Sequence, residues 1–217
     1  MPQPFTRAQI EELVIDRSRP LVICDVDEVV VHFIEGFEAH LESNGYWLDF
    51  ESFALNGNVR HRQTGESLPG ELVSAQVMEF FAARTRHQPL IPGAVEALNS
   101  LSDHAEIVML TNLPGEFRQE RIENLMGHGL HHPVVVNSGP KGPAVRLLTE
   151  THAAPVVFID DSPSYLASVY EHNPDCKLIH FLQDERLQKV VEPMPWLSLR
   201  TAHWPEAHAH VMELIGA

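Results

Sequence analysis

The sequence is poor in cysteine, in basic residues and in long apolar runs, and each shortage argues against a class of protein. Its 217 residues include only two cysteines, Cys24 and Cys176, which stand far apart in apolar segments, so we expect buried thiols and no disulfide framework. Fifteen lysines and arginines against thirty acidic residues give a net charge of −15, which argues against nonspecific binding to nucleic acid or to anionic membranes. We find neither a run long enough to span a bilayer nor the pattern of a secretory signal, so we expect a cytoplasmic protein.

Apolar, strand-like segments alternate with helix-like segments along most of the chain. Such alternation, with nearly continuous apolar runs in the strands, predicts a parallel sheet covered on both faces, that is, a three-layer α/β/α Rossmann-like fold. The C-terminal part is expected to pack as a loop and a final helix, with Trp196 and Trp204 as anchors. The expected strands cover 21–26, 105–112, 132–137, 154–161 and 176–182, and the expected helices cover 6–17 (with Thr6 as its cap), 91–101, 114–127, 142–152 and 162–172.

Residues 34–88 interrupt this alternation. A turn-rich stretch over 55–70 is followed by an apolar stretch over 71–87 with helical spacing. We predict that 34–88 forms a small, mainly helical cap, and that 1–33 and 89–217 form the Rossmann-like catalytic core. Loops at the carboxyl ends of parallel strands carry ligand sites, so a cap here is expected to cover the site. An elaborated connection without substrate contact is the alternative.

Two pairs of acidic residues stand where apolar strands end. Asp25 and Asp27 finish "LVICDVD", and Asp160 and Asp161 finish "PVVFIDD". The carboxyl ends of parallel strands share one edge of the sheet, so these four carboxylates can converge there. A cluster of like charges needs a cation, and oxygen ligands with room for water suit Mg²⁺. We therefore expect a magnesium site.

Other polar groups stand at matching strand exits. Thr111 and Asn112 follow "AEIVML", and Lys141 follows "PVVVN" at the start of a helix. A hydroxyl, helix-start amides and an ammonium group suit the oxygens of a phosphate. Each feature alone has an ordinary explanation as a cap, a turn or a solvated side chain. Their joint order along the chain is what indicates a phosphate site.

These segments together resemble the haloacid dehalogenase-like hydrolase superfamily, most of whose members are Mg²⁺-dependent phosphatases. "DVDEV" at 25–29 matches its DxDx(T/V) pattern, and "VMLTN", "PKGPAVRLL" and "VFIDDS" match its other motifs. The resemblance covers about 21–182, and residues 34–88 occupy the position of the family's helical cap. It implies an enzyme that hydrolyses a phosphomonoester.

The resemblance also implies catalytic and metal-binding roles. Asp25 is the nucleophile that becomes an aspartyl-phosphate, and Asp27 is the general acid and then the general base. The Asp25 carboxylate, the Asp27 backbone carbonyl and Asp161 bind Mg²⁺, and Asp160 supports the ion directly or through water. Dehalogenating relatives lack the second aspartate, so Asp27 favours phosphatase chemistry.

Substrate contacts are expected on both sides of the site. By the same resemblance, Thr111, the Asn112 backbone and Lys141 hold the transferring phosphoryl group. Arg60 and Arg62 stand in the turn-rich part of the insert and could hold an anionic leaving group, although a solvated basic loop is an equal alternative.

One position departs from the family pattern. Many members have glycine after the second aspartate, whereas this chain has Glu28. "DVDEVVVH" is closer in style to the RNA polymerase tail phosphatases, which lack a large helical cap. The expected substrate is a small phosphorylated metabolite. A phosphoprotein, a mutase reaction and a non-catalytic binding scaffold are the alternatives, and the sequence does not indicate an oligomeric state.

Overall fold

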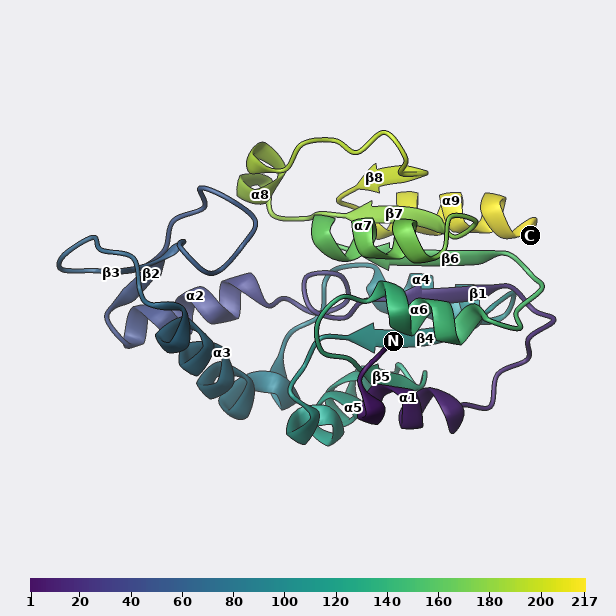
Figure 1. Cartoon of the computed structure of the whole chain (residues 1–217), viewed down its shortest axis with the longest axis horizontal. Coiled ribbons are helices and arrows are strands. Elements are labelled where there is room, and N and C mark those ends of the chain that lie inside the picture. Colours follow the sequence, from purple (N-terminus) through teal and green to yellow (C-terminus); the bar gives the residue numbers. More distant parts are fainter.

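The core of the molecule, in a computed structural model that describes residues 1–217, is a six-stranded sheet between two layers of helices (Figure 1). All neighbouring strands are parallel, in the order β5-β4-β1-β6-β7-β8. The predicted parallel α/β/α fold is confirmed. The strands are β1 (Leu21–Cys24), β4 (Glu106–Thr111), β5 (Val134–Val136), β6 (Val156–Asp160), β7 (Lys177–Phe181) and β8 (Leu199–Thr201).

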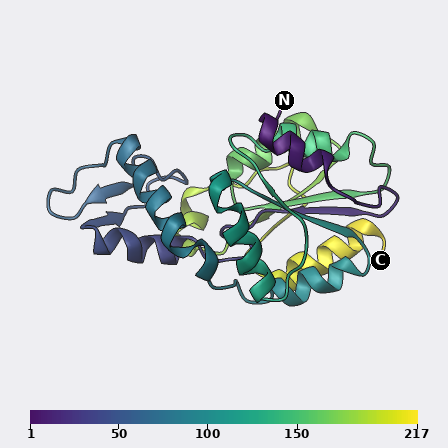
Figure 2. The ribbon, with the colours of Figure 1, turned by 90° about the horizontal axis from the view of Figure 1, so that it is seen from below.

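The side chains of each strand alternate between two apolar layers. On β1, Val22 and Cys24 join the apolar cluster on one face of the sheet, whereas Leu21 and Ile23 join the cluster on the opposite face. Burial on both faces explains why the strands read as continuous apolar runs. One layer contains α1 (Pro4–Glu11), α6 (Gly142–Thr149) and α7 (Pro163–His172), and the other contains α4 (Ala94–Ser102), α5 (Arg118–Gly127) and α9 (Trp204–Ile215), as Figure 2 shows.

The first helix differs from its prediction at the N-terminus. It begins at Pro4, and a proline is well suited to a first turn that needs no backbone donor. Thr6, predicted as the cap, lies inside the helix, and its hydroxyl donates a hydrogen bond to the Val136 carbonyl oxygen at 3.0 Å. The hydroxyl therefore ties α1 to β5, a tertiary role that local sequence does not reveal.

The C-terminal part contains more structure than the expected loop and helix. It adds α8 (Glu185–Val190) and the edge strand β8 before α9. Trp204 is fully buried, and its Nε1 donates to the Val29 carbonyl oxygen at 2.8 Å. Trp196 stacks on Tyr170 with ring centroids 4.8 Å apart. Trp204 thus anchors α9 to the segment that follows β1. No helix in the chain combines the length and apolarity needed to cross a bilayer.

Residues 34–88, predicted as the cap and given that name below, form a lobe beyond the carboxyl ends of the strands (Figures 1 and 2). Phe37, Phe80 and Phe81 pack in its apolar cluster. Part of the predicted turn-rich stretch is instead β3, the second strand of an antiparallel hairpin that the sequence analysis did not predict, because strands of three residues carry little periodic signal. The elements are α2 (Ile34–Ser43), β2 (Tyr46–Leu48), β3 (Val59–His61), α3 (Gly70–Arg84) and the short 3-10 helix η1 (Thr85–His87).

Candidate active site

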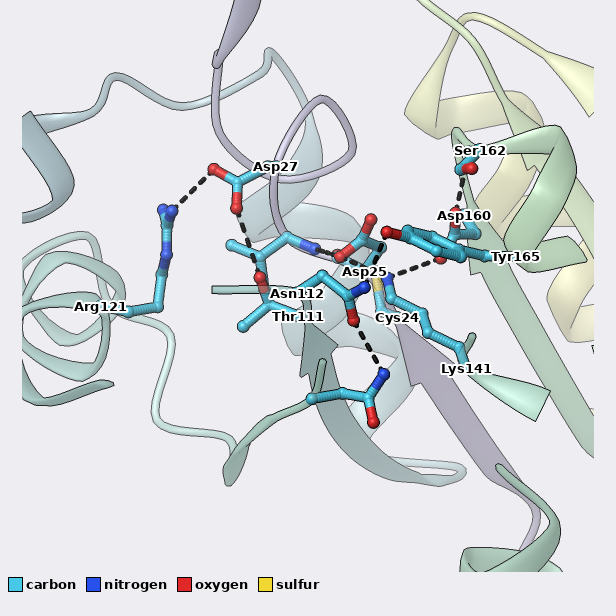
Figure 3. A network of polar contacts seen from close by, with 12 residues as sticks. Cys24, Asp25, Asp27, Thr111, Asn112, Arg121, Lys141, Asp160, Ser162 and Tyr165 are labelled. Atoms are coloured by element: carbon cyan, nitrogen blue, oxygen red, sulfur yellow. Dashed lines mark hydrogen bonds and ion pairs between the residues drawn. The ribbon is translucent and has the colours of Figure 1, made fainter. Parts of the chain in front are cut away.

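The carboxyl end of β1 is the point where the strand order reverses. The chain places β4 and β5 on one side of β1 and β6, β7 and β8 on the other. Open α/β sheets bind ligands at such a point. Asp25 follows β1, Thr111 ends β4 and Asp160 ends β6, so strand register alone brings these side chains to one edge (Figure 3).

A buried lysine links the two acidic motifs. Lys141, just before α6, is fully buried, and its Nζ lies 2.7 Å from Asp25 Oδ1 and 2.7 Å from Asp160 Oδ2. Each carboxylate also accepts a hydrogen bond from a backbone N–H group. The Val26 N–H donates to Asp25 Oδ1 at 2.7 Å, and the Ser162 N–H donates to Asp160 Oδ1 at 2.8 Å. Buried charges are tolerated only with such partners, so Lys141 holds both carboxylates in place.

The acidic cluster exceeds the charge that Lys141 can balance. Asp25, Asp160 and Asp161 each offer a carboxylate oxygen, and these oxygens lie within 4.8 Å of one another. Burial raises the pKa of Asp25 to about 7, against the opposing effect of Lys141. Burial and the neighbouring carboxylates also raise the pKa of Asp161 well above its usual range. A doubly charged ion would stabilise the ionised cluster, and an all-oxygen donor set fits Mg²⁺.

The second aspartate of the motif lies apart from this cluster. The Asp27 carboxylate is directed toward α5 (Figure 3), where Arg121 Nη2 lies 2.7 Å from its Oδ1. Gln88 Nε2 donates to the same oxygen at 3.1 Å, and the Thr111 hydroxyl donates to Oδ2 at 3.3 Å. Gln88 Nε2 also donates to the His32 carbonyl oxygen at 3.1 Å. The network therefore joins Asp27 to both chain segments that connect core and cap.

Arg121 and Gln88 were not identified from the sequence. Arg121 is completely buried, on the same stripe of α5 as Asn124 and Leu125. An arginine at a core-facing position of an amphipathic helix is unusual unless it is paired. Its position on the helix could therefore have indicated that Arg121 has a buried acidic partner. Gln88 gave no such signal, because its contacts with Asp27 and His32 are long-range.

Amide groups shape the wall beside Lys141. The Asn112 side-chain nitrogen donates to the Tyr165 hydroxyl at 2.7 Å and to the Gly139 carbonyl oxygen at 2.9 Å. Its side-chain oxygen accepts from Asn137 Nδ2 at 2.9 Å. The Tyr165 ring centroid lies 5.0 Å from Lys141 Nζ. The Asn112 side chain is thus engaged in holding the loops after β4 and β5 together.

The contacts of Glu28 give a structural reason for a glutamate at the position where many family members have glycine. It has a φ of 60°, a conformation that favours glycine and costs another residue about 1–2 kcal/mol. Its Oε1 accepts hydrogen bonds from the Phe33 and Ile34 N–H groups at 2.7 and 2.6 Å, at the N-terminus of α2. A carboxylate there is favoured by the free amides and the helix dipole. Glu28 therefore offsets its strain by fixing the first helix of the cap to the site, and burial raises its pKa to about 7.

A pocket of about 510 Å³ lies between the acidic floor and the cap. Asp25, Asp27 and Asp161 line its floor, and ten of its eighteen lining residues are hydrophobic. The apolar wall includes Phe33, Phe50, Phe53, Leu55, Val77 and Phe81.

The structure does not bring Arg60 and Arg62 to this pocket. Arg60 pairs with Asp49 at 2.8 Å and with Glu51 at 2.7 Å, and Arg62 pairs with Glu42 at 2.8 Å. Neither arginine is among the residues that line the pocket. Acidic neighbours within the cap therefore neutralise the loop that the sequence suggested as an anion site.

Comparison with known proteins identifies the fold. No family model and no curated protein matches the sequence. A HAD family hydrolase from Deinococcus radiodurans, solved with bound phosphate and sodium, superimposes with a TM-score of 0.62 at 16% identity, covering 92% of this chain and 97% of that one. The HAD hydrolase YfnB from Bacillus subtilis bound to magnesium gives 0.60 at 14% identity, covering 89% and 98%. A predicted phosphoglycolate phosphatase from Haemophilus somnus gives 0.57 at 11% identity, covering 91% and 100%.

The chain has the haloacid dehalogenase-like hydrolase fold. Within this fold, the structure brings Asp25, Lys141, Asp160 and Asp161 into one cluster, with Thr111 beside it. Asp27 lines the same pocket, although its carboxylate is held by Arg121, and Asn112 forms part of the wall.

Proposed function

We propose that this chain is a Mg²⁺-dependent phosphatase that hydrolyses a small phosphomonoester through an aspartyl-phosphate on Asp25. The observation that carries the proposal is the position of the Asp25 carboxylate, between a buried lysine and further carboxylates, at the floor of a pocket under the cap. The convergence of matching motifs on the same fold as known HAD hydrolases supports it.

The nucleophilic oxygen can be assigned from the contacts of Asp25. Lys141 and the Val26 N–H both bind Oδ1, whereas no hydrogen bond from the protein reaches Oδ2. We assign Oδ2 as the atom that attacks phosphorus in line with the leaving alcohol. We propose that Lys141 and Thr111, which are fully buried beside Asp25 and Asp27, stabilise the charge on oxygens of the transferring phosphoryl group, which is mainly an electrostatic task.

Mg²⁺ would be held by the clustered carboxylates of Asp25 and Asp161, with support from Asp160 and, as we propose, from the Asp27 backbone carbonyl, and when bound it would neutralise phosphoryl charge. In the first step Asp27, in its protonated form, donates its proton to the leaving alcohol and becomes the carboxylate, the form that pairs with Arg121. It then removes a proton from the water that attacks the phosphorus, which releases phosphate and regenerates Asp25. Arg121 and Gln88 both contact Asp27 Oδ1 and hold the carboxylate in position after the first step and before the second.

The pocket supports a small substrate. A phosphoprotein phosphatase would be expected to have an open groove, whereas here the cap supplies a large part of the wall above Asp25. A cavity of about 510 Å³ is the size that suits a small molecule.

Hydrolysis of p-nitrophenyl phosphate by the purified protein tests the proposal. We expect turnover with Mg²⁺, none in excess EDTA, and a loss of about 10³-fold or more in Asp25→Asn. Asp103→Asn, an exposed acidic residue outside the site, is the matched control and should keep wild-type activity. Unchanged activity in EDTA or in Asp25→Asn would exclude this mechanism.

A further inference from the structure

We infer that the natural substrate is the phosphate monoester of an uncharged, largely apolar alcohol, with an aromatic or branched aliphatic group seated against the cap. This inference rests on the proposed phosphatase function and specifies the leaving group. It is carried by two separate properties of the pocket, its charge and its apolar wall.

The pocket contains no cation for a second anionic group. None of its eighteen lining residues is a lysine, an arginine or a histidine, and Asp25, Asp27, Glu28 and Asp161 are all acidic. Lys141 lies beneath the floor and is paired with Asp25 and Asp160. A bound Mg²⁺ would serve the transferring phosphoryl group, so a carboxylate or second phosphate on the leaving group would enter an acidic, partly desolvated space without a partner.

Three arginines in or beside the cap are already paired with acidic residues. Arg60 and Arg62 pair with acidic residues of the cap, as described above. Arg186 stacks on the Phe50 ring at 4.6 Å, but its guanidinium pairs with Glu38 at 2.6 Å and Asp184 at 2.7 Å. An anionic leaving group could recruit one of these three arginines only by breaking its ion pair, and no other basic residue lines the pocket.

The apolar wall is assembled from several parts of the chain. Phe33 lies before α2, Phe53 and Leu55 lie between β2 and β3, Val77 lies on α3, and Leu187 comes from α8 of the core. Convergence of such residues on the space above the nucleophile is what selects an apolar ligand.

Two aromatic residues of this wall, Phe33 and Phe81, belong to a packed cluster of rings. The Phe33 ring centroid lies 5.2 Å from that of Phe37, 5.2 Å from that of Phe80 and 5.5 Å from that of Phe81. Rings fixed in this way offer stacking and edge contacts to an aromatic ligand at little entropic cost. A sugar phosphate would find few groups in this wall for its hydroxyls.

A matched pair of substrates tests the charge argument. Benzyl phosphate and 4-carboxybenzyl phosphate share the reacting centre and the ring, and differ only in one distal carboxylate. With wild-type protein and Mg²⁺ we expect kcat/KM to be about tenfold or more higher for benzyl phosphate, the size of discrimination that an unmatched group in a pocket produces. Equal or higher kcat/KM for the carboxylated compound would overturn the inference.

A pair of neighbouring variants tests the location. Val77→Lys places a cation in the wall, whereas Met78→Lys places one on the adjacent exposed position of the same helix, outside the pocket lining. Val77→Lys should raise kcat/KM for 4-carboxybenzyl phosphate and lower it for benzyl phosphate, and Met78→Lys should change neither. If Val77→Lys does not fold, Leu55→Lys in the cap loop makes the same test. No change in preference in a folded wall variant would contradict the inference.

The outcomes separate this inference from the proposed function. Absence of Mg²⁺- and Asp25-dependent hydrolysis of any of these esters would remove the phosphatase proposal itself. Dependent hydrolysis with a preference for the carboxylated ester would remove only the apolar substrate class. A large preference for a phosphotyrosine peptide over benzyl phosphate would assign the aromatic wall to a protein substrate and overturn the small-molecule assignment.

Discussion

The acidic floor of the pocket and the apolar wall above it, which we call the roof, are built by different means. The roof consists of Phe33, Phe50, Phe53, Leu55, Val77, Phe81 and Leu187. Parallel register places Cys24 beside Met109 and Ile159, so the residues that follow reach the same edge, and buried ion pairs then fix them. The roof is an apolar cluster whose members come from the cap and α8. Exchanging a floor residue leaves a buried charge without a partner, whereas exchanging a roof residue alters shape and polarity. In the proposed function, the reaction therefore depends on the floor, and the inferred substrate preference depends on the roof.

Removing the floor cation should have the largest effect. In Lys141→Met the Asp25 and Asp160 carboxylates lose their shared partner, so we expect the free energy of unfolding to fall by about 3–5 kcal/mol in EDTA, with activity falling to background. Denaturant titration measures the first and phosphate release the second. Lys189→Met, an exposed lysine, is the control and should unfold like the wild type. Equal stability of both variants would show that the buried pairs do not hold the floor.

Removing Arg121 should affect the reaction more than substrate binding. Arg121→Leu frees the Asp27 carboxylate from its partner at 2.7 Å, so we expect kcat to fall by about 10–100-fold with KM little changed. Steady-state kinetics with benzyl phosphate measure both constants. Arg118→Leu, one turn earlier on α5, loses only bonds to the Val134 carbonyl oxygen and should keep kcat. An increase in KM alone would place Arg121 in the roof and not in the proton-transfer machinery.

Magnesium should stabilise the protein, and more so at higher pH. In EDTA the raised pKa of Asp25, about 7, means that the folded state holds its proton more tightly than the unfolded state. The stabilisation of the folded state by this more tightly held proton is complete below the ordinary aspartate pKa, and it is lost as the pH rises through about 7. Mg²⁺ requires the ionised carboxylates, so its stabilising effect should be larger at pH 8 than at pH 6.

Thermal unfolding measures this effect. At pH 8 and a free Mg²⁺ concentration of roughly 100 times Kd, we expect a rise in Tm of about 5–10 °C. Asp161→Asn removes a proposed ligand and should abolish most of the rise, whereas Asp103→Asn should keep it. A shift that is independent of pH, or that persists in Asp161→Asn, would place the ion elsewhere.

The smallest effect is expected where floor and roof meet, at Glu28. Glu28→Ala keeps the φ of 60° and loses both bonds to α2, whereas Glu28→Gly loses the bonds but relieves the strain. We therefore expect Glu28→Ala to be less stable than Glu28→Gly by about 1 kcal/mol. Calorimetry or denaturant titration makes the comparison. The reverse order would show that the left-handed conformation is not maintained in the variants.

The sequence indicated the floor far better than the roof. Thr111 and Asp160 end apolar strands, and Asp25 and Lys141 follow such strands. Parallel pairing carries strand ends to one edge whatever the details of packing. Side chains whose role depends on a distant partner could not be predicted in this way. Arg121 meets Asp27 across 94 positions of the chain, and Arg60 was suggested as a substrate ligand although its partners are Asp49 and Glu51.

Short elements were missed for a related reason. The β2–β3 hairpin and β8 consist of strands of three residues, too short for a periodic pattern to distinguish them from turns. Thr6 looked like a helix cap because its type suits one, but its hydroxyl donates a hydrogen bond to the Val136 carbonyl oxygen of β5. Tertiary contacts overrode local preference at these positions.

The identity of the phosphorylated residue tests the central claim most directly. A single-turnover reaction of the wild-type protein with benzyl phosphate and Mg²⁺, quenched in acid and mapped by peptide mass spectrometry, should show one phosphoryl group on Asp25 that forms before phosphate is released. The same experiment on Asp25→Asn should show neither. Phosphate release at the wild-type rate from Asp25→Asn, or a phosphoryl group on another residue, would contradict the assignment of Asp25 as the nucleophile.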